Sequence, residues 1–197
     1  MEESIYQAPK ADVGEKEAGD AMFYVVSTRK LLLLHFFTVG VYPLYWFYKN
    51  WSLYSKNAGK KMLPVMRAIF SIFFAHSLFA LLESKSAERN DSYKWSCTAA
   101  ATVYVIFTIV GNIADRLAYR AVGEPLTDFI GILVLPVIAW SLYKAQLAAN
   151  IACNDPDGAR NNELNALNYL WLFLGSLLWI LIGIGLYDLT VGLPEFD

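Results

Sequence analysis

The stretch from Leu31 to Trp51 places the strongest constraint on how this chain can fold. It is an apolar run that Gly40 and Pro43 interrupt near its middle, and basic residues flank it at both ends. From Leu31 to Phe47 it could form roughly 25 Å of helix at about 1.5 Å per residue. Because a bilayer core about 30 Å thick needs about 20 apolar residues, this run is short for one span. The pattern therefore predicts a membrane segment that is not an ordinary transmembrane helix.

The composition agrees with a membrane location. The chain is 56% hydrophobic and only 17% charged, whereas soluble domains carry about 25% charged residues. Four further apolar runs come close to the length of a span, at about 63–82, 97–114, 126–143 and 167–186. We therefore expect an all-α, polytopic membrane protein with four transmembrane helices plus an N-terminal re-entrant or interfacial helical hairpin over residues 29–57.

The domain organisation follows from the distribution of charge. Residues 1–22 are polar and hold six acidic against two basic side chains, so they have little apolar surface to bury. We expect a disordered polar tail over 1–22 and a single helical membrane domain over 23–197.

The basic residues distinguish two topologies, because Lys and Arg gather on the cytoplasmic side. If the first run spans and the chain then alternates sides, nine basic residues lie inside and seven outside. If the run turns back at residues 40–43, eleven lie inside and five outside. The count favours the hairpin, with the N- and C-termini both cytoplasmic. An ordinary first span, giving five spans in all, stays as the alternative.

The second half of the first run carries the candidate site. Trp and Tyr side chains collect at the headgroup level of a membrane, and exposed basic residues there attract anionic lipid. The clustering predicts a surface that binds lipid or a protein partner. An ordinary interfacial aromatic belt is the alternative. The candidate residues are Gly40, Tyr42, Pro43, Trp46, Lys49, Asn50 and Trp51.

Four short motifs carry a resemblance. They read VSTRKL at 26–31, TVGVY at 38–42, YWFYKNW at 45–51 and PVMRAIF at 64–70. Together they resemble a family of small bacterial inner-membrane proteins of unknown activity, with the signature V-S-x-x-K-L, T-x-G-x-Y, Y-W-F-Y-K-N-W and P-x-x-R-A-x-F. The resemblance covers residues 26–83 and is looser beyond them. It implies a multi-pass protein of the bacterial inner membrane and no particular activity.

Two histidines fall inside apolar segments, where an ionisable side chain is a functional hypothesis. His35 and His76 could be polar side chains satisfied within the helix bundle, or could bind a ligand or carry a proton. Nothing in the sequence brings the two rings together, so we expect no metal and no cofactor. Cys97 and Cys153 have no metal-site spacing, and whether they pair is left open.

Polar residues of the later runs allow similar alternatives. Gln146 and Asn150 are four apart and share a helical face, where their amides could join helices or bind a ligand. Asp115 and Arg116 could anchor a helix end, or Asp115 could form a polar pathway with Asp128.

The sequence contains no phosphate-binding loop, nucleophile elbow or zinc-binding histidine pair, so we do not expect an enzyme. The net charge of −2 gives no reason to expect nucleic acid as a partner. We expect an integral inner-membrane protein, a structural or interaction component whose hairpin faces lipid or a partner. Its expected partners are membrane lipids, with a protein partner or a second copy as further options. The alternative is a small transporter or channel using the broken first element and the intramembrane histidines.

Overall fold

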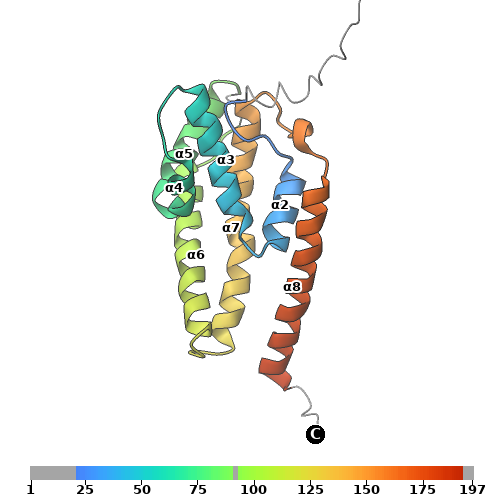
Figure 1. Cartoon of the computed structure of the whole chain (residues 1–197). Helices are drawn as coiled ribbons and strands as arrows, with labels where there is room; N and C mark the ends of the chain where they lie inside the picture. Colours follow the sequence, from blue (N-terminus) through green and yellow to red (C-terminus); the bar gives the residue numbers. More distant parts are fainter. Residues whose placement is uncertain (1–20, 91–92, 193–197) are drawn as a thin grey trace, which may run out of the picture.

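The computed structural model describes residues 21–90 and 93–192, and these residues form a helical bundle with no strand among them (Figure 1). The polar tail expected over 1–22 lies outside the described residues except for its last two positions. The α-helices are α2 (Thr28–Phe37), α3 (Tyr42–Asn57), α4 (Pro64–Ile69), α5 (Ser71–Ala87), α6 (Cys97–Ala118), α7 (Leu126–Ala152) and α8 (Ala166–Val191), and a short 3₁₀ helix covers Ala159–Asn161.

Helices α2 and α3 form a hairpin whose tip lies near the middle of the bundle's height (Figure 1). The side chain of Ser27 caps α2 by accepting from the backbone N–H of Lys30, which satisfies one of the free donors at a helix start. The turn needs left-handed backbone, with φ of 48° at Val39 and 79° at Gly40. Pro43 then lies in the first turn of α3, where its missing N–H costs nothing. The expected hairpin around Gly40 and Pro43 is therefore present in the fold.

Three helices, α6, α7 and α8, are long and apolar enough to cross a membrane. They have 22, 27 and 26 residues and contain the expected runs at 97–114, 126–143 and 167–186. The chain is thus compatible with a membrane protein. Helix α7 packs against α6 on one side and α2 on the other, and α8 packs against α2 (Figure 1).

The expected span at 63–82 is not confirmed as a single long helix. Phe70 breaks it into α4, of six residues, and α5, of 17 residues. Helix α5 packs against the upper part of α6. The hydroxyls of Ser71 and Tyr104 lie 3.0 Å apart, and the Glu83 carboxylate accepts a hydrogen bond from the Cys97 backbone N–H. The sequence has no glycine or proline at this break, so nothing in it marks the interruption. Among the described residues, three helices are therefore long and apolar enough to span a membrane, and the fourth expected span is not confirmed.

Aromatic rings fill the core between α3, α5 and α6. Phe47 stacks on Phe79 with ring centroids 6.3 Å apart, and Trp46 meets Phe79 edge to face. Tyr104 contacts both Phe47 and Phe79. Such ring pairs contribute about 0.5–1.5 kcal/mol each beyond the area they bury.

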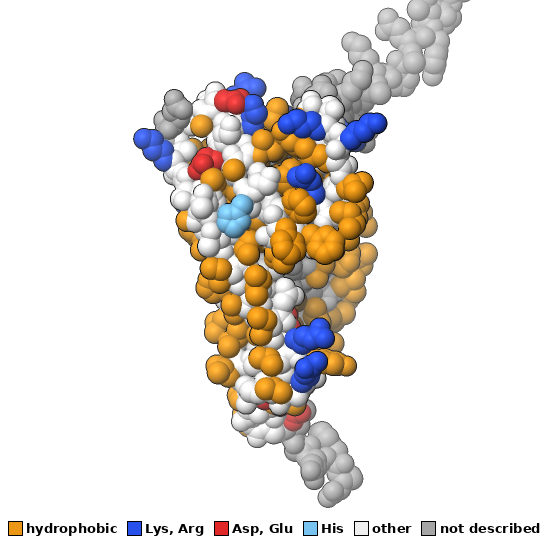
Figure 2. Space-filling view, turned by 90° about the vertical axis from the view of Figure 1, so that its left-hand side faces the viewer, with side chains coloured by type: hydrophobic (Ala, Val, Ile, Leu, Met, Phe, Trp, Pro, Cys, Tyr) orange, Lys and Arg blue, Asp and Glu red, His pale blue; other side chains and the backbone are white. Residues whose placement is uncertain are grey.

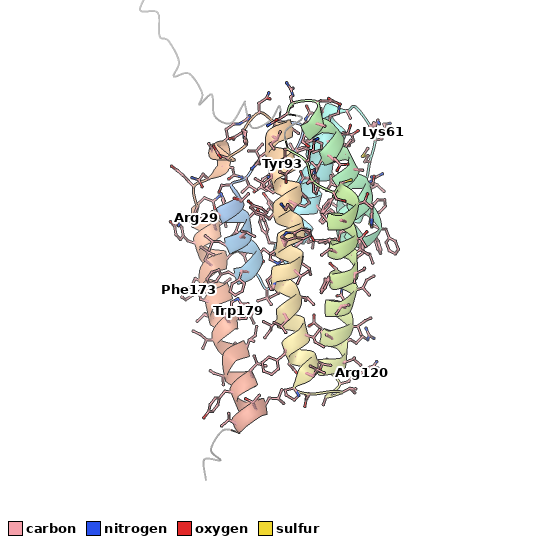
Figure 3. The ribbon with its side chains drawn as sticks, turned by 180° about the vertical axis from the view of Figure 1, so that it is seen from behind. Arg29, Lys61, Tyr93, Arg120, Phe173 and Trp179 are labelled. Atoms are coloured by element: carbon pink, nitrogen blue, oxygen red, sulfur yellow. The ribbon has the colours of Figure 1, made fainter. Side chains whose placement is uncertain are left out.

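Basic side chains lie at both ends of the bundle, and more of them lie at the upper end. The α3–α4, α5–α6 and α7–α8 connections lie at the upper end of Figure 1, and the α6–α7 turn lies at the lower end. Figure 2 shows Lys and Arg side chains gathered at the upper end, a hydrophobic belt below them and a smaller basic group near the lower end. Arg29 and Lys61 lie in the upper part and Arg120 at the lower end (Figure 3). The described chain enters at the upper end and leaves at the lower end, so the expectation of both termini on one side is not confirmed.

Candidate functional site

A network of buried side-chain amides joins the hairpin to α7. Trp46 donates its indole N–H to Gln146 on α7 across 2.5 Å, and the Gln146 amide N–H donates to Asn150 and to the Tyr24 carbonyl. The Asn150 side chain in turn accepts from the backbone N–H of Val26 and donates to the Val26 carbonyl. Gln146 and Asn150 are fully buried, so they act in packing between helices, the first of the two alternatives for this pair.

The network places most of the predicted site residues inside the protein. Trp46 and Asn50 are fully buried, and Trp51 is 1% exposed beneath the Arg67 guanidinium. Asn50 accepts from the Tyr24 backbone N–H and donates to the carbonyl of Trp46. These side chains contact protein, and they do not form the lipid-facing surface that their composition indicated.

The other predicted site residues take different positions. Pro43 is buried at the start of α3, and Gly40 lies at the hairpin tip against Leu135 of α7. Tyr42 is 7% exposed. Lys49 is half-buried over the ring of Tyr45, with its Nζ 5.7 Å from the ring centre.

Two cavities adjoin the hairpin, and the tip separates them. Thr38 and Val41 line an upper groove of about 620 Å³, and Val39 and Gly40 line a lower cavity of about 590 Å³. Their polar linings have opposite charge, which decides what each could hold.

The upper groove lies between the hairpin, α4 and the first turns of α8. Three tyrosines spaced three apart on α3, Tyr42, Tyr45 and Tyr48, line it together with Trp171 of α8. Lys30, Asn161, Asn165 and Asn168 add polar groups, and no acidic residue of the described chain lines the groove. Its rim is apolar and exposed, at Val41, Leu44, Val65, Ile69 and Leu167.

Lys30 is the charged residue of the groove that sequence reasoning missed. It is 5% exposed, and its Nζ donates to Asn161 Oδ1 at 2.7 Å and to the Glu163 carbonyl at 2.6 Å. The sequence offered only its adjacency to Arg29 at the start of an apolar run. The tyrosine spacing was a visible signal for the groove wall, since residues three apart share a helical face.

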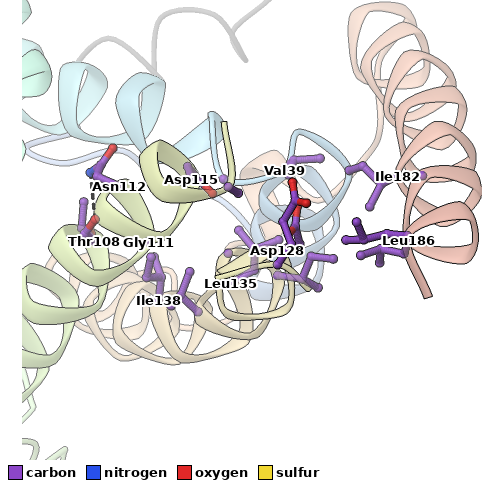
Figure 4. Close-up of a pocket in the computed structure, with 18 of the residues that line it drawn as sticks. Val39, Thr108, Gly111, Asn112, Asp115, Asp128, Leu135, Ile138, Ile182 and Leu186 are labelled. Carbon is purple, nitrogen blue, oxygen red and sulfur yellow. Dashed lines mark hydrogen bonds between the residues drawn. The ribbon is translucent and has the colours of Figure 1, made fainter. Parts of the chain in front are cut away.

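The lower cavity lies beneath the hairpin tip, among α6, α7 and α8 (Figure 4). Asp115 of α6 and Asp128 of α7 both line it. The Asp115 carboxylate lies over Gly131, where a Cβ would approach it to 2.6 Å. Among the described residues, one oxygen of Asp128 is buried without a hydrogen-bond partner. Asn112, Glu124 and Asp188 complete the polar lining.

The histidines do not meet. His35 is 1% exposed and donates from Nε2 to the Leu135 carbonyl at 3.0 Å, while His76 is exposed and pairs with Thr102 on α6. Cys97 and Cys153 are both free thiols, and Cys97 donates to the Glu83 carboxylate. The structure thus contains no disulfide between them.

Comparison with known proteins adds no relative to this description. No family model, curated protein or solved structure matches the chain, so the family resemblance remains a prediction that rests on the four sequence motifs.

Proposed function

We propose that this chain is an integral membrane protein that binds the acyl part of a membrane lipid in the upper groove. The observation that carries the proposal is the groove itself, which is about 620 Å³ in volume, walled by tyrosines and Trp171, and rimmed by exposed apolar side chains. Pockets of 300–1,000 Å³ with apolar and aromatic linings are typical ligand sites. In a membrane, this rim would face hydrocarbon, so the acyl chain of a lipid is the ligand that can enter the groove directly.

A topology belongs to the same proposal. Most basic residues of the described chain lie toward the upper end, whereas Arg116 and Arg120 lie near the α6–α7 turn at the lower end. Lys and Arg mark the cytoplasmic side. The upper end is then cytoplasmic, with three spans, and the α2–α3 and α4–α5 pairs entering and leaving on that side. Irregular backbone at membrane depth is tolerated where it is buried in protein or lines a cavity, and the hairpin tip lies against Leu135 of α7 and lines both cavities. The bacterial inner membrane as the location is inferred from the motif resemblance alone.

Single-cysteine labelling in intact cells tests the topology, in a protein whose Cys97 and Cys153 are replaced by alanine. Positions 57, 90 and 160 should report the cytoplasmic side, and positions 121 and 191 the other side. Position 90 is decisive, because a fourth span at 63–82 would put it on the opposite side of the membrane from position 57.

A photoactivatable phospholipid with a diazirine on its acyl chain tests lipid binding. We expect cross-links to peptides of α3, α4 and the start of α8 in the purified full-length protein. Ile69→Trp places a large ring at the groove and should lower the labelling several-fold. Phe73→Trp, at an exposed residue of α5 outside the groove, is the matched control. Equal labelling of the two variants at these peptides would refute the proposal.

The lower cavity favours a second candidate function, a small transporter or channel. A cavity with an unpartnered polar atom at membrane depth is typical of substrate or ion pathways, and here it reaches the tip of a broken element. Flux of small cations into proteoliposomes, lost on Asp128→Asn and retained on the neighbouring Phe129→Leu, would favour this function over lipid binding alone.

A further inference from the structure

The charge of Lys30 inside the groove is not neutralised by any carboxylate of the described residues. Its two hydrogen-bond acceptors, Asn161 Oδ1 and the Glu163 carbonyl, are neutral. The ion pairs of the described chain are Lys85 with Glu88 and Arg160 with Asp155. Removing a charge from water costs several kcal/mol unless a counter-ion is present. A buried lysine without one therefore indicates an anion that the groove is built to receive.

The groove also holds donors that the protein does not use. An ammonium group has three N–H donors, and two of those on Lys30 are engaged. The side chains of Asn165 and Asn168 cap the start of α8 through their oxygens, and their amide N–H groups donate to no other group of the described residues. One charged and two neutral donor groups thus line the end of the groove where α2 and α8 begin.

This donor set suits a phosphate group, whose several oxygens can accept from more than one donor at once. Because no acidic residue of the described chain lines the groove, the ammonium of a zwitterionic lipid would meet no opposite charge there. A soluble anion would leave the aromatic walls unused. Basic pockets between membrane helices on the cytoplasmic side commonly bind anionic headgroups.

Resting on the proposed function, we propose that the lipid in the groove is an anionic phospholipid, with its phosphate on Lys30 and its acyl chain along Tyr42, Tyr45 and Tyr48. Lys30 selects the headgroup, and the tyrosine wall holds the chain. The headgroup then lies at the level where α2 begins, and the chain extends toward the hairpin tip.

Native mass spectrometry of the full-length protein in neutral detergent tests this selection. Phosphatidylglycerol and phosphatidylcholine with identical chains are titrated separately. We expect the wild type to bind phosphatidylglycerol about tenfold more tightly. Lys30→Met should lower its affinity for phosphatidylglycerol to that for phosphatidylcholine, and Lys30→Arg should retain the preference. Arg29→Met is the matched control, because Arg29 is the exposed neighbour outside the groove and its loss removes the same charge at the same end.

The outcomes separate the inference from the function beneath it. If Lys30→Met keeps the preference for phosphatidylglycerol, or if Arg29→Met loses that preference equally, the headgroup assignment is overturned. The proposed function is not affected by that result, because Ile69→Trp tests binding of the acyl chain separately. If inorganic phosphate or glycerol phosphate displaces the lipid at equal concentration, the site binds a free anion, and the assignment of the site to a phospholipid also fails. If Lys30→Met does not fold, Asn168→Leu replaces it, and an unchanged preference in that variant counts against the phosphate site. If Ile69→Trp changes no lipid's binding, the proposed function itself is wrong.

Discussion

The indole N–H of Trp46 donates to the side-chain oxygen of Gln146 across 2.5 Å, joining α3 to α7 over 100 positions of sequence. Both side chains are fully buried. A tryptophan that composition assigns to a membrane interface is thus a hydrogen-bond donor in the protein core. The hairpin is held by polar contacts with α7 as much as by apolar packing.

Replacing Gln146 with methionine should destabilise the protein by about 1–3 kcal/mol, because the Trp46 N–H and the Tyr24 carbonyl would be left buried without partners. The free energy of unfolding in mixed SDS micelles measures this. Trp46→Phe removes the donor alone. In the double variant the loss should be smaller than the sum of the two single losses, and strict additivity would show that the bond contributes nothing specific.

Replacing Gly175 with alanine should loosen α8 from α2. The added Cβ would overlap the backbone carbonyl of Phe37, and overpacking of this kind costs about 1–3 kcal/mol. Thermal unfolding in detergent should show a lower midpoint. Gly183→Ala is the control on the same helix, because a Cβ there has nothing within 4 Å. Similar midpoints for the two variants would argue against close α2–α8 packing.

The α7–α8 connection should lose stability in acid through Asp155. Burial alone would raise the pKa of its carboxyl, but bonds from the backbone N–H groups of Arg160 and Ala159 and from the Arg160 guanidinium outweigh burial and hold the pKa below its ordinary value. A depressed pKa stabilises the fold above the unfolded pKa, and this stability is lost as pH falls through the folded value.

The wild type should therefore lose roughly 1.5–3 kcal/mol, typical for bonds to a charged group, as the pH falls below about 4. Asp155→Asn should be weaker at pH 7 and should show a flatter dependence between pH 5 and pH 3. Thermal midpoints across that range measure both. An unchanged slope in the variant would mean that another carboxyl controls the acid transition.

The lower cavity should admit water to the middle of α6. Thr108 lines the cavity, whereas the adjacent Ile109 is 42% exposed and does not line it. In a background without Cys97 and Cys153, Thr108→Cys should react with a charged, membrane-impermeant thiol reagent added from the lower side. Ile109→Cys should react at least tenfold more slowly, since hydrocarbon surrounds it. Equal rates would indicate that the cavity is dry or closed.

The sequence predicted the features that depend on local chemistry. Gly40 and Pro43 marked the hairpin because its turn needs left-handed backbone and α3 needs a start without an N–H. The four-residue spacing of Gln146 and Asn150 placed them on one face. The three long apolar runs from residue 97 onward correspond to α6, α7 and α8.

The sequence did not predict features that depend on which helices meet. Trp46 and Trp51 have the composition of an interfacial belt, and only the packing of α5 and α7 against α3 buries them. The break at Phe70 carries no local signal. The groove could not be derived either, because Lys30 and Asn168 are brought to one end only when α8 packs beside α2.

The bonds between Val26 and Asn150 join positions 124 apart, and this has a consequence for biosynthesis. During translation the segment before α2 leaves the ribosome long before its partner on α7 exists. Until then its backbone groups and the buried face of the hairpin have no lasting contacts. The first apolar element to meet the insertion machinery is therefore among the last to reach its final position. A chain truncated before residue 146 would lack the α7 side chains that bind this element.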